Sequence, residues 1–144
     1  MDKKKYKTLR KYLNQIVEEF NNIYAKHGKK LFYYQEKQID DFDDVFAKLL
    51  KPLQKYLVED REDENYDDLL NLYFDINRYF KITDHYSEGF YSIIAYDEIN
   101  DEIYFEIKCI DPSQVLKNIY SFARTAVFFS ATLSPMDYFM RMLG

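Results

Sequence analysis

The sequence predicts an α+β protein in which a helical bundle precedes a small α/β region. With only 3 Gly and 3 Pro in 144 residues, the chain has few of the residues that tight turns require, so long helices are favoured. Residues 1–88 carry apolar side chains at helical spacing, whereas residues 89–144 contain alternating apolar and polar positions typical of strands. A hydrophobic content of 47% is enough for a core of ordinary size.

Three amphipathic helices are predicted in residues 1–88. The first runs from Lys5 to His27 with apolar residues three or four positions apart, and Gly28 fits a left-handed cap. A second pattern extends from Ile39 to Leu57 and contains Pro52, where we expect a kink or a break because proline lacks the backbone N–H. The third covers Leu69 to Phe80. Three such helices can bury their apolar faces against one another.

Residues 89–144 predict first a β-hairpin. Phe90 to Tyr96 and Ile103 to Cys109 are rich in β-forming residues and flank a polar loop. A helix then starts as a capping box at Asp111, with Gln114 three residues later. The change of pattern near Gly89 predicts two domains, residues 1–88 and residues 89–144.

One further strand and one further helix are predicted after this point. The apolar run Ala126 to Phe129 is typical of a strand buried on both faces of a parallel sheet. A second capping box at Ser134 opens a helix that ends at Gly144.

Composition excludes several classes of protein. The single cysteine, Cys109, excludes an internal disulfide and multi-cysteine metal sites, and it is predicted to be a packed small side chain. His27 and His85 lack a second ligand at metal-binding spacing, so no metal site is expected. The longest stretch without a charge, Thr125 to Met136, has 12 residues and is too short to span a membrane. No secretory signal is recognised at the start, so a cytoplasmic location is predicted.

Charge is unevenly distributed along the chain. The net charge is −5, but residues 1–30 hold nine Lys and Arg against three Asp and Glu, a net charge of +6. One interpretation of this basic start is a phosphate contact with single-stranded DNA; the other is a solvated helix end. The candidate DNA-binding residues are Lys3, Lys4, Lys5, Lys7, Arg10 and Lys11, with Lys26, Lys29 and Lys30 at the far end of the same predicted helix.

The 15 Tyr and 12 Phe also allow two interpretations. Most of them lie on the apolar helical faces and are expected in the core, although exposed rings would offer stacking surfaces for bases. The acidic run from Glu59 to Asp68 predicts an exposed loop that would repel DNA or attract a basic partner.

The stretch Ser130-Ala131-Thr132-Leu133-Ser134-Pro135 places two hydroxyl residues between a predicted strand and a predicted helix. Ligand sites of α/β proteins lie at such carboxyl edges of a sheet. The same triplet can also be simply a strand end.

In their order, the elements of residues 103–144 resemble the end of the first motor domain in DinG-like superfamily 2 DNA helicases, the group of the xeroderma pigmentosum group D helicase. The matching elements are Cys109-Ile110-Asp111-Pro112-Ser113, the strand Ala126 to Phe129, Ser130-Ala131-Thr132-Leu133-Ser134-Pro135 and Leu143-Gly144. The resemblance implies that residues 1–88 are the Arch, a helical insertion above the single-stranded DNA path. It also implies that Ser130, Ala131 and Thr132 form helicase motif III, which couples nucleotide state to strand movement through hydrogen bonds to the magnesium-holding acidic motif.

By this resemblance, the full-length parent would use ATP and Mg²⁺ to translocate 5′ to 3′ on single-stranded DNA in repair or replication. The chain itself contains no phosphate-binding Gly-x-x-x-x-Gly-Lys-Ser/Thr loop, no Asp-Glu-Ala-His element and no iron–sulphur cysteines, so we expect it to be inactive alone. Whether the parent carries an iron–sulphur cluster stays open. The rival hypothesis is a non-enzymatic interaction module whose helical part binds a protein partner.

Overall fold

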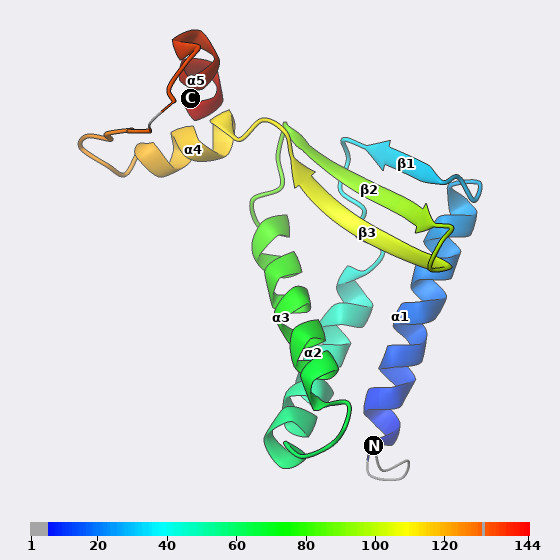
Figure 1. The fold of residues 1–144 in the computed structure, drawn as a ribbon. Helices are drawn as coiled ribbons and strands as arrows, with labels where there is room; N and C mark the ends of the chain where they lie inside the picture. The colour runs from blue at the N-terminus through cyan, green and yellow to red at the C-terminus, as the bar shows by residue number, and fades with distance from the viewer. Residues whose placement is uncertain (1–5, 131) are drawn as a thin grey trace.

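The computed structural model describes residues 6–130 and 132–144, and within them the chain folds into five helices and an open three-stranded antiparallel sheet (Figure 1). The predicted α+β class is therefore confirmed. Helices α1, α2 and α3 extend from one face of the sheet, whereas α4 and α5 lie beyond its end (Figure 1). The elements are α1 (Lys7–Lys26), β1 (Phe32–Gln35), α2 (Asp43–Glu59), α3 (Tyr66–Thr83), β2 (Phe90–Asp97), β3 (Glu102–Cys109), α4 (Ser113–Tyr120) and α5 (Met136–Leu143).

Helices α1 and α3 confirm the first and third helices predicted from apolar spacing. In α1, Leu9, Ile16 and Ile23 follow one another at intervals of two helical turns, so they share one side of the helix, and all three are buried. The helix ends as predicted at Gly28, whose φ of 74° lies in the left-handed region that glycine adopts without steric cost.

The sequence predicts a kink or a break at Pro52. Helix α2 continues through this residue, so the break is wrong, while the kink stays a prediction. Proline inside a helix costs roughly 3 kcal/mol because it removes one hydrogen bond and crowds the preceding turn. Leu49 and Leu53 on either side of it are fully buried. Since burial of each leucine contributes about 1.5–3 kcal/mol, core packing offsets the cost and keeps the helix intact.

The sheet has the strand order β1-β2-β3. Strands β2 and β3 form the predicted hairpin, in which Ile94 lies opposite Phe105. Strand β1 comes from the loop between α1 and α2 and pairs with β2, with Tyr33 opposite Ile94. Sequence analysis did not predict this strand, because four residues, Phe-Tyr-Tyr-Gln, are too few to show an alternating pattern.

The strand predicted at Ala126–Phe129 does not form. The segment has no regular secondary structure, and Val127 and Phe129 are 80% and 91% exposed. A parallel strand needs parallel neighbours for its backbone hydrogen bonds. All strand pairs that the structure describes are antiparallel, so the sheet offers residues 126–129 no parallel neighbour. The third strand of the sheet is β1 instead.

The helices predicted on either side of this segment do form, as α4 and α5. The Asp111 carboxylate accepts a hydrogen bond from the Ser113 backbone N–H at 3.0 Å and thereby satisfies one free donor at the start of α4. This bond holds the pKa of Asp111 below its usual range. The N-cap residues are Pro112 for α4 and Pro135 for α5, and neither makes a side-chain cap, so the capping boxes predicted at Asp111 and Ser134 are wrong.

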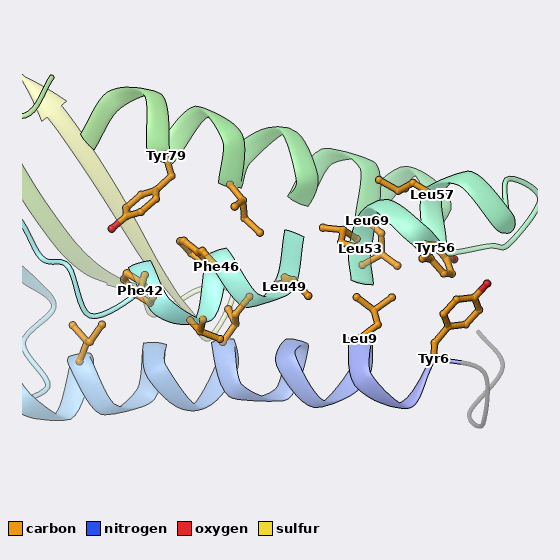
Figure 2. Packing of buried hydrophobic residues seen from close by; sticks show 14 of the residues in the cluster. Tyr6, Leu9, Phe42, Phe46, Leu49, Leu53, Tyr56, Leu57, Leu69 and Tyr79 are labelled. Carbon is orange, nitrogen blue, oxygen red and sulfur yellow. The ribbon is translucent and has the colours of Figure 1, made fainter. Parts of the chain in front are cut away.

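An aromatic cluster joins the three long helices to the sheet; it consists of Phe20, Phe42, Phe46, Tyr79 and Phe105. Phe42 is fully buried, and its ring centroid lies 4.6 Å from that of Phe20 on α1 and 5.1 Å from that of Phe105 on β3. Tyr79 on α3 is 5.1 Å from Phe46 on α2. Figure 2 shows Phe42, Phe46 and Tyr79 directed into the space between the helices.

Two buried hydroxyls fix the segment that leads into α2. Ser92 on β2 accepts a hydrogen bond from the Ile39 backbone N–H at 3.1 Å and lies 3.1 Å from the Tyr86 hydroxyl. The Tyr79 hydroxyl donates to the Asp43 carboxylate, and burial together with this bond raises the pKa of Tyr79. The two Ser92 bonds cross the division predicted between residues 1–88 and 89–144, which stays a prediction.

Gly89 closes the base of the hairpin. Its carbonyl accepts hydrogen bonds from the backbone N–H groups of Ile110 at 2.8 Å and Asp111 at 3.2 Å. Its φ is 91°, and a Cβ atom at this position would lie 2.3 Å from the Asp111 carbonyl oxygen. Only glycine therefore fits without movement of the backbone.

We predict that Gly89→Ala lowers the free energy of unfolding by more than Gly28→Ala does. Both positions have positive φ, which costs a non-glycine residue about 1–3 kcal/mol, but no atom lies within 4 Å of a Cβ built at Gly28. Urea denaturation measures the free energy of unfolding of both variants. Because the cost of positive φ is common to both, the difference between them reports the collision with Asp111. Equal destabilisation would contradict the tight closure of the hairpin.

Candidate functional site

The basic candidates that the structure describes lie on the first turns of α1. Lys7, Arg10 and Lys11 are exposed and, with Asn14 and Glu18, line a shallow surface depression of about 470 Å³. Among the described residues, none of the three forms an ion pair, and the Lys11 ammonium lies 5.7 Å from the Tyr12 ring centre. Lys3, Lys4 and Lys5 lie outside the described residues.

The predicted acidic loop lies at the same end of the molecule (Figure 1). Asp60 to Asn65 connect α2 to α3, as predicted for the centre of the run Glu59–Asp68. The Tyr6 hydroxyl, one residue before α1, donates to the Asp60 carboxylate and lies 3.4 Å from Glu59 Oε2. Carboxylates this close lower the positive potential around Lys7 and weaken its attraction for phosphates.

A second group of lysines lies at the other end of α1. Lys26 forms an ion pair with Asp41 at 3.1 Å, while Lys29 and Lys30 are exposed after the helix. A helix of 20 residues is about 30 Å long. The two groups of basic residues are therefore separated by the whole length of α1 and do not form one patch.

The predicted motif III residues lie on the exposed segment before α5. Ser130 and Thr132 are exposed, and the Thr132 backbone N–H donates to Ser130 Oγ at 3.3 Å; Ala131 lies outside the described residues. Within the described part of the chain, no bond to an acidic motif is recorded for either hydroxyl. Cys109 is exposed at the end of β3, so its prediction as a packed side chain is wrong.

In residues 6–130 and 132–144 no group of three His, Cys, Asp or Glu side chains is arranged to hold a metal ion. The His27 ring stacks on Tyr33 at a centroid distance of 3.8 Å, and burial together with the neighbouring Lys26 lowers the pKa of His27.

Among the helices of the described residues, none combines the length and the apolar character that spanning a bilayer requires.

A wide depression lies between α1 and the turn of the hairpin. It has a volume of about 990 Å³, and its wall includes Tyr24 and Tyr96, whose rings stack 5.4 Å apart. Tyr96 also donates a hydrogen bond to Asp101. Because these two rings already stack on each other, they offer no free slot for a flat ligand.

The outer face of the sheet carries aromatic rings that sequence analysis did not assign to a site. Paired residues of an antiparallel sheet point to the same side. The register places Phe32, Tyr34, Tyr91 and Tyr104 on the face opposite the helices. Once the hairpin is predicted, the alternation of Tyr104 with Ile103 and Phe105 is the only signal in the sequence for this face.

Comparison with protein-family models, with curated proteins and with solved structures finds no significant match. The resemblance of residues 103–144 to DinG-like helicases therefore depends on the order of its short motifs.

We predict that single-stranded DNA binds the chain weakly through α1 and that the affinity falls as salt rises. Changing Lys7, Arg10 and Lys11 together to Glu should abolish this binding, whereas the same reversal at Lys29, Lys30 and Lys37 should preserve it. Fluorescence anisotropy with a labelled oligothymidylate measures both. The two triple variants have the same net charge, so equal losses would show that overall charge, and not the start of α1, determines binding.

Proposed function

We propose that this chain is part of an ATP-dependent DNA helicase of the DinG-like group. Residues 1–88 would form the Arch-like helical region, and residues 89–144 the end of the first motor domain. The observation that carries the proposal is the order of motifs from Cys109 through Ser130-Ala131-Thr132 to Leu143-Gly144. The helical hairpin of α2 and α3 beside α1 is in keeping with a helical Arch.

The exposed apolar residues of the last third support the proposal. Phe122 is fully accessible at 92%, and Val127, Phe129 and Met140 also have most of their surface in solvent. Large exposed apolar side chains concentrated in one part of a chain are typical of a surface that another domain or a partner covers. A motor-domain sheet would supply the parallel neighbours that the segment Ala126–Phe129 lacks.

The chain's own contribution to such an enzyme would be positioning. ATP and Mg²⁺, when bound to the parent, supply the phosphoryl chemistry, and the residues that hold them belong outside this chain. Ser130 and Thr132 would offer their hydroxyls from a short exposed segment between α4 and α5. The Arch-like region would present Lys7, Arg10 and Lys11 to the DNA backbone.

A different observation favours the alternative, a non-enzymatic interaction module, but it places the interacting surface on the sheet and not on the helical part. The outer face of the sheet exposes aromatic side chains that take no part in the helicase resemblance. The two hypotheses differ in one measurable property, because only the first requires nucleotide hydrolysis by the protein that contains this chain.

We predict that the 144-residue chain alone shows no magnesium-dependent ATP hydrolysis, because it lacks a phosphate-binding loop. The protein encoded by the complete reading frame should hydrolyse ATP when single-stranded DNA is added. A coupled phosphate-release assay on both measures this. Turnover by the chain alone, or none by the complete protein, would contradict the helicase proposal.

A second prediction concerns Thr132 in the complete protein. Thr132→Ala should leave ATP binding nearly unchanged and reduce unwinding per ATP hydrolysed, because loss of one hydrogen bond costs on the order of 1 kcal/mol. Thr132→Ser keeps the hydroxyl and should restore the ratio. A purely structural role predicts a lower melting temperature, with hydrolysis and unwinding falling together. An unchanged ratio in the alanine variant would remove Thr132 from the coupling role.

A further inference from the structure

We propose that the outer face of the sheet binds a cationic protein segment, namely an extended stretch of chain that carries arginine or lysine side chains. This aromatic face is defined by Phe32, Tyr34, Tyr91 and Tyr104, with Ile93 and Ala95 between them. The proposal stands independently of the helicase hypothesis, because it uses none of the motif residues.

Three of the four rings lie next to one another. The centroid of Tyr34 lies 6.0 Å from that of Phe32 and 6.1 Å from that of Tyr91. Ile93 and Ala95 are buried, although they point away from the helices, so the neighbouring side chains of the face cover them. Phe32, Tyr34 and Tyr104 themselves remain 56%, 61% and 49% exposed. The face therefore offers flat aromatic area, with the aliphatic side chains beneath it.

The charges around the rings are mostly negative. Glu102 and Glu106 occupy outward positions of β3 on either side of Tyr104, and both are exposed. Glu36, just after β1, accepts a hydrogen bond from the Tyr91 hydroxyl at 3.2 Å. Lys108 is the cation at the outward positions of the three strands. Carboxylates thus flank the aromatic surface on both β1 and β3.

This combination selects a cation. A guanidinium or ammonium group is attracted to the face of an aromatic ring, and guanidinium also forms paired hydrogen bonds with carboxylates. The carboxylates would repel the phosphates of a nucleic acid, although bases can stack on such rings. Charge complementarity therefore favours a basic protein segment over single-stranded DNA.

The test is a titration of the isotope-labelled 144-residue chain, followed by amide chemical shifts, with a synthetic peptide of four Arg-Gly repeats. Matched probes are the corresponding Gln-Gly peptide and an oligothymidylate of about twelve nucleotides. We expect the arginine peptide to bind and to shift amide signals of β1, β2 and β3, and the glutamine peptide not to bind. No binding by the arginine peptide, or shifts confined to other regions, would overturn the proposal.

Variants identify the groups responsible. Phe32→Ala with Tyr34→Ala should weaken peptide binding about ten-fold, because both rings attract the cation. Glu102→Lys with Glu106→Lys should weaken it further. Phe74→Ala and the pair Glu62→Lys, Glu64→Lys change an equally exposed ring and two exposed carboxylates elsewhere. Equal losses in these controls would overturn the proposal, because they would show attraction to any acidic surface.

Tighter binding of the oligothymidylate on the same face would overturn the proposal in favour of base stacking. The shift map of the unmodified chain decides the location if a variant unfolds.

Discussion

Phe42 is the point on which the arrangement of this molecule depends. Its ring is fully buried at the start of α2, where it packs against Phe20 from α1, Phe46 from its own helix and Phe105 from β3. Helix α3 joins the same cluster through Tyr79. The hydroxyls of Ser92 and Tyr79 then orient the chain around Ile39 and Asp43 as it enters α2.

The fold was predictable where one periodic pattern was long enough to be read. Residues 7–26 and 66–83 repeat their apolar positions over many turns. In the hairpin, β3 alternates along its length, and β2 is rich in β-forming residues. Strand β1 is a different case: its four residues gain their conformation from pairing with β2, which lies nearly sixty positions away in the chain. The continuity of α2 through Pro52 has the same origin, because the burial of Leu49 and Leu53 is a tertiary effect that local preference does not contain. The missing strand at Ala126–Phe129 shows the converse, since an apolar run forms a strand only beside a partner.

The kinds of residue in the candidate sites could be predicted from the sequence, but their positions in the fold mostly could not. Clusters of lysine are visible in any sequence, but the acidic loop that reaches the start of α1 is known only once α2 and α3 are seen to return the chain to that end. The outer aromatic face needed the register of three strands, one of which had no pattern of its own. For Ser130 and Thr132 the sequence order is informative, while their surroundings in this chain are mostly solvent.

The closure of the hairpin at Gly89 also determines how the molecule transmits mechanical load. The chain enters the hairpin at Gly89 and leaves it at Ile110 and Asp111, which hydrogen-bond to the same carbonyl group. Tension between α3 on one side of the hairpin and α4 on the other would therefore pull on two strand ends that lie next to each other. In this geometry the hydrogen bonds between β2 and β3 open one after another from the base, and they never share the load. The connection between the last third of the chain and its helical part is thus mechanically soft, even though the hairpin itself is fully paired.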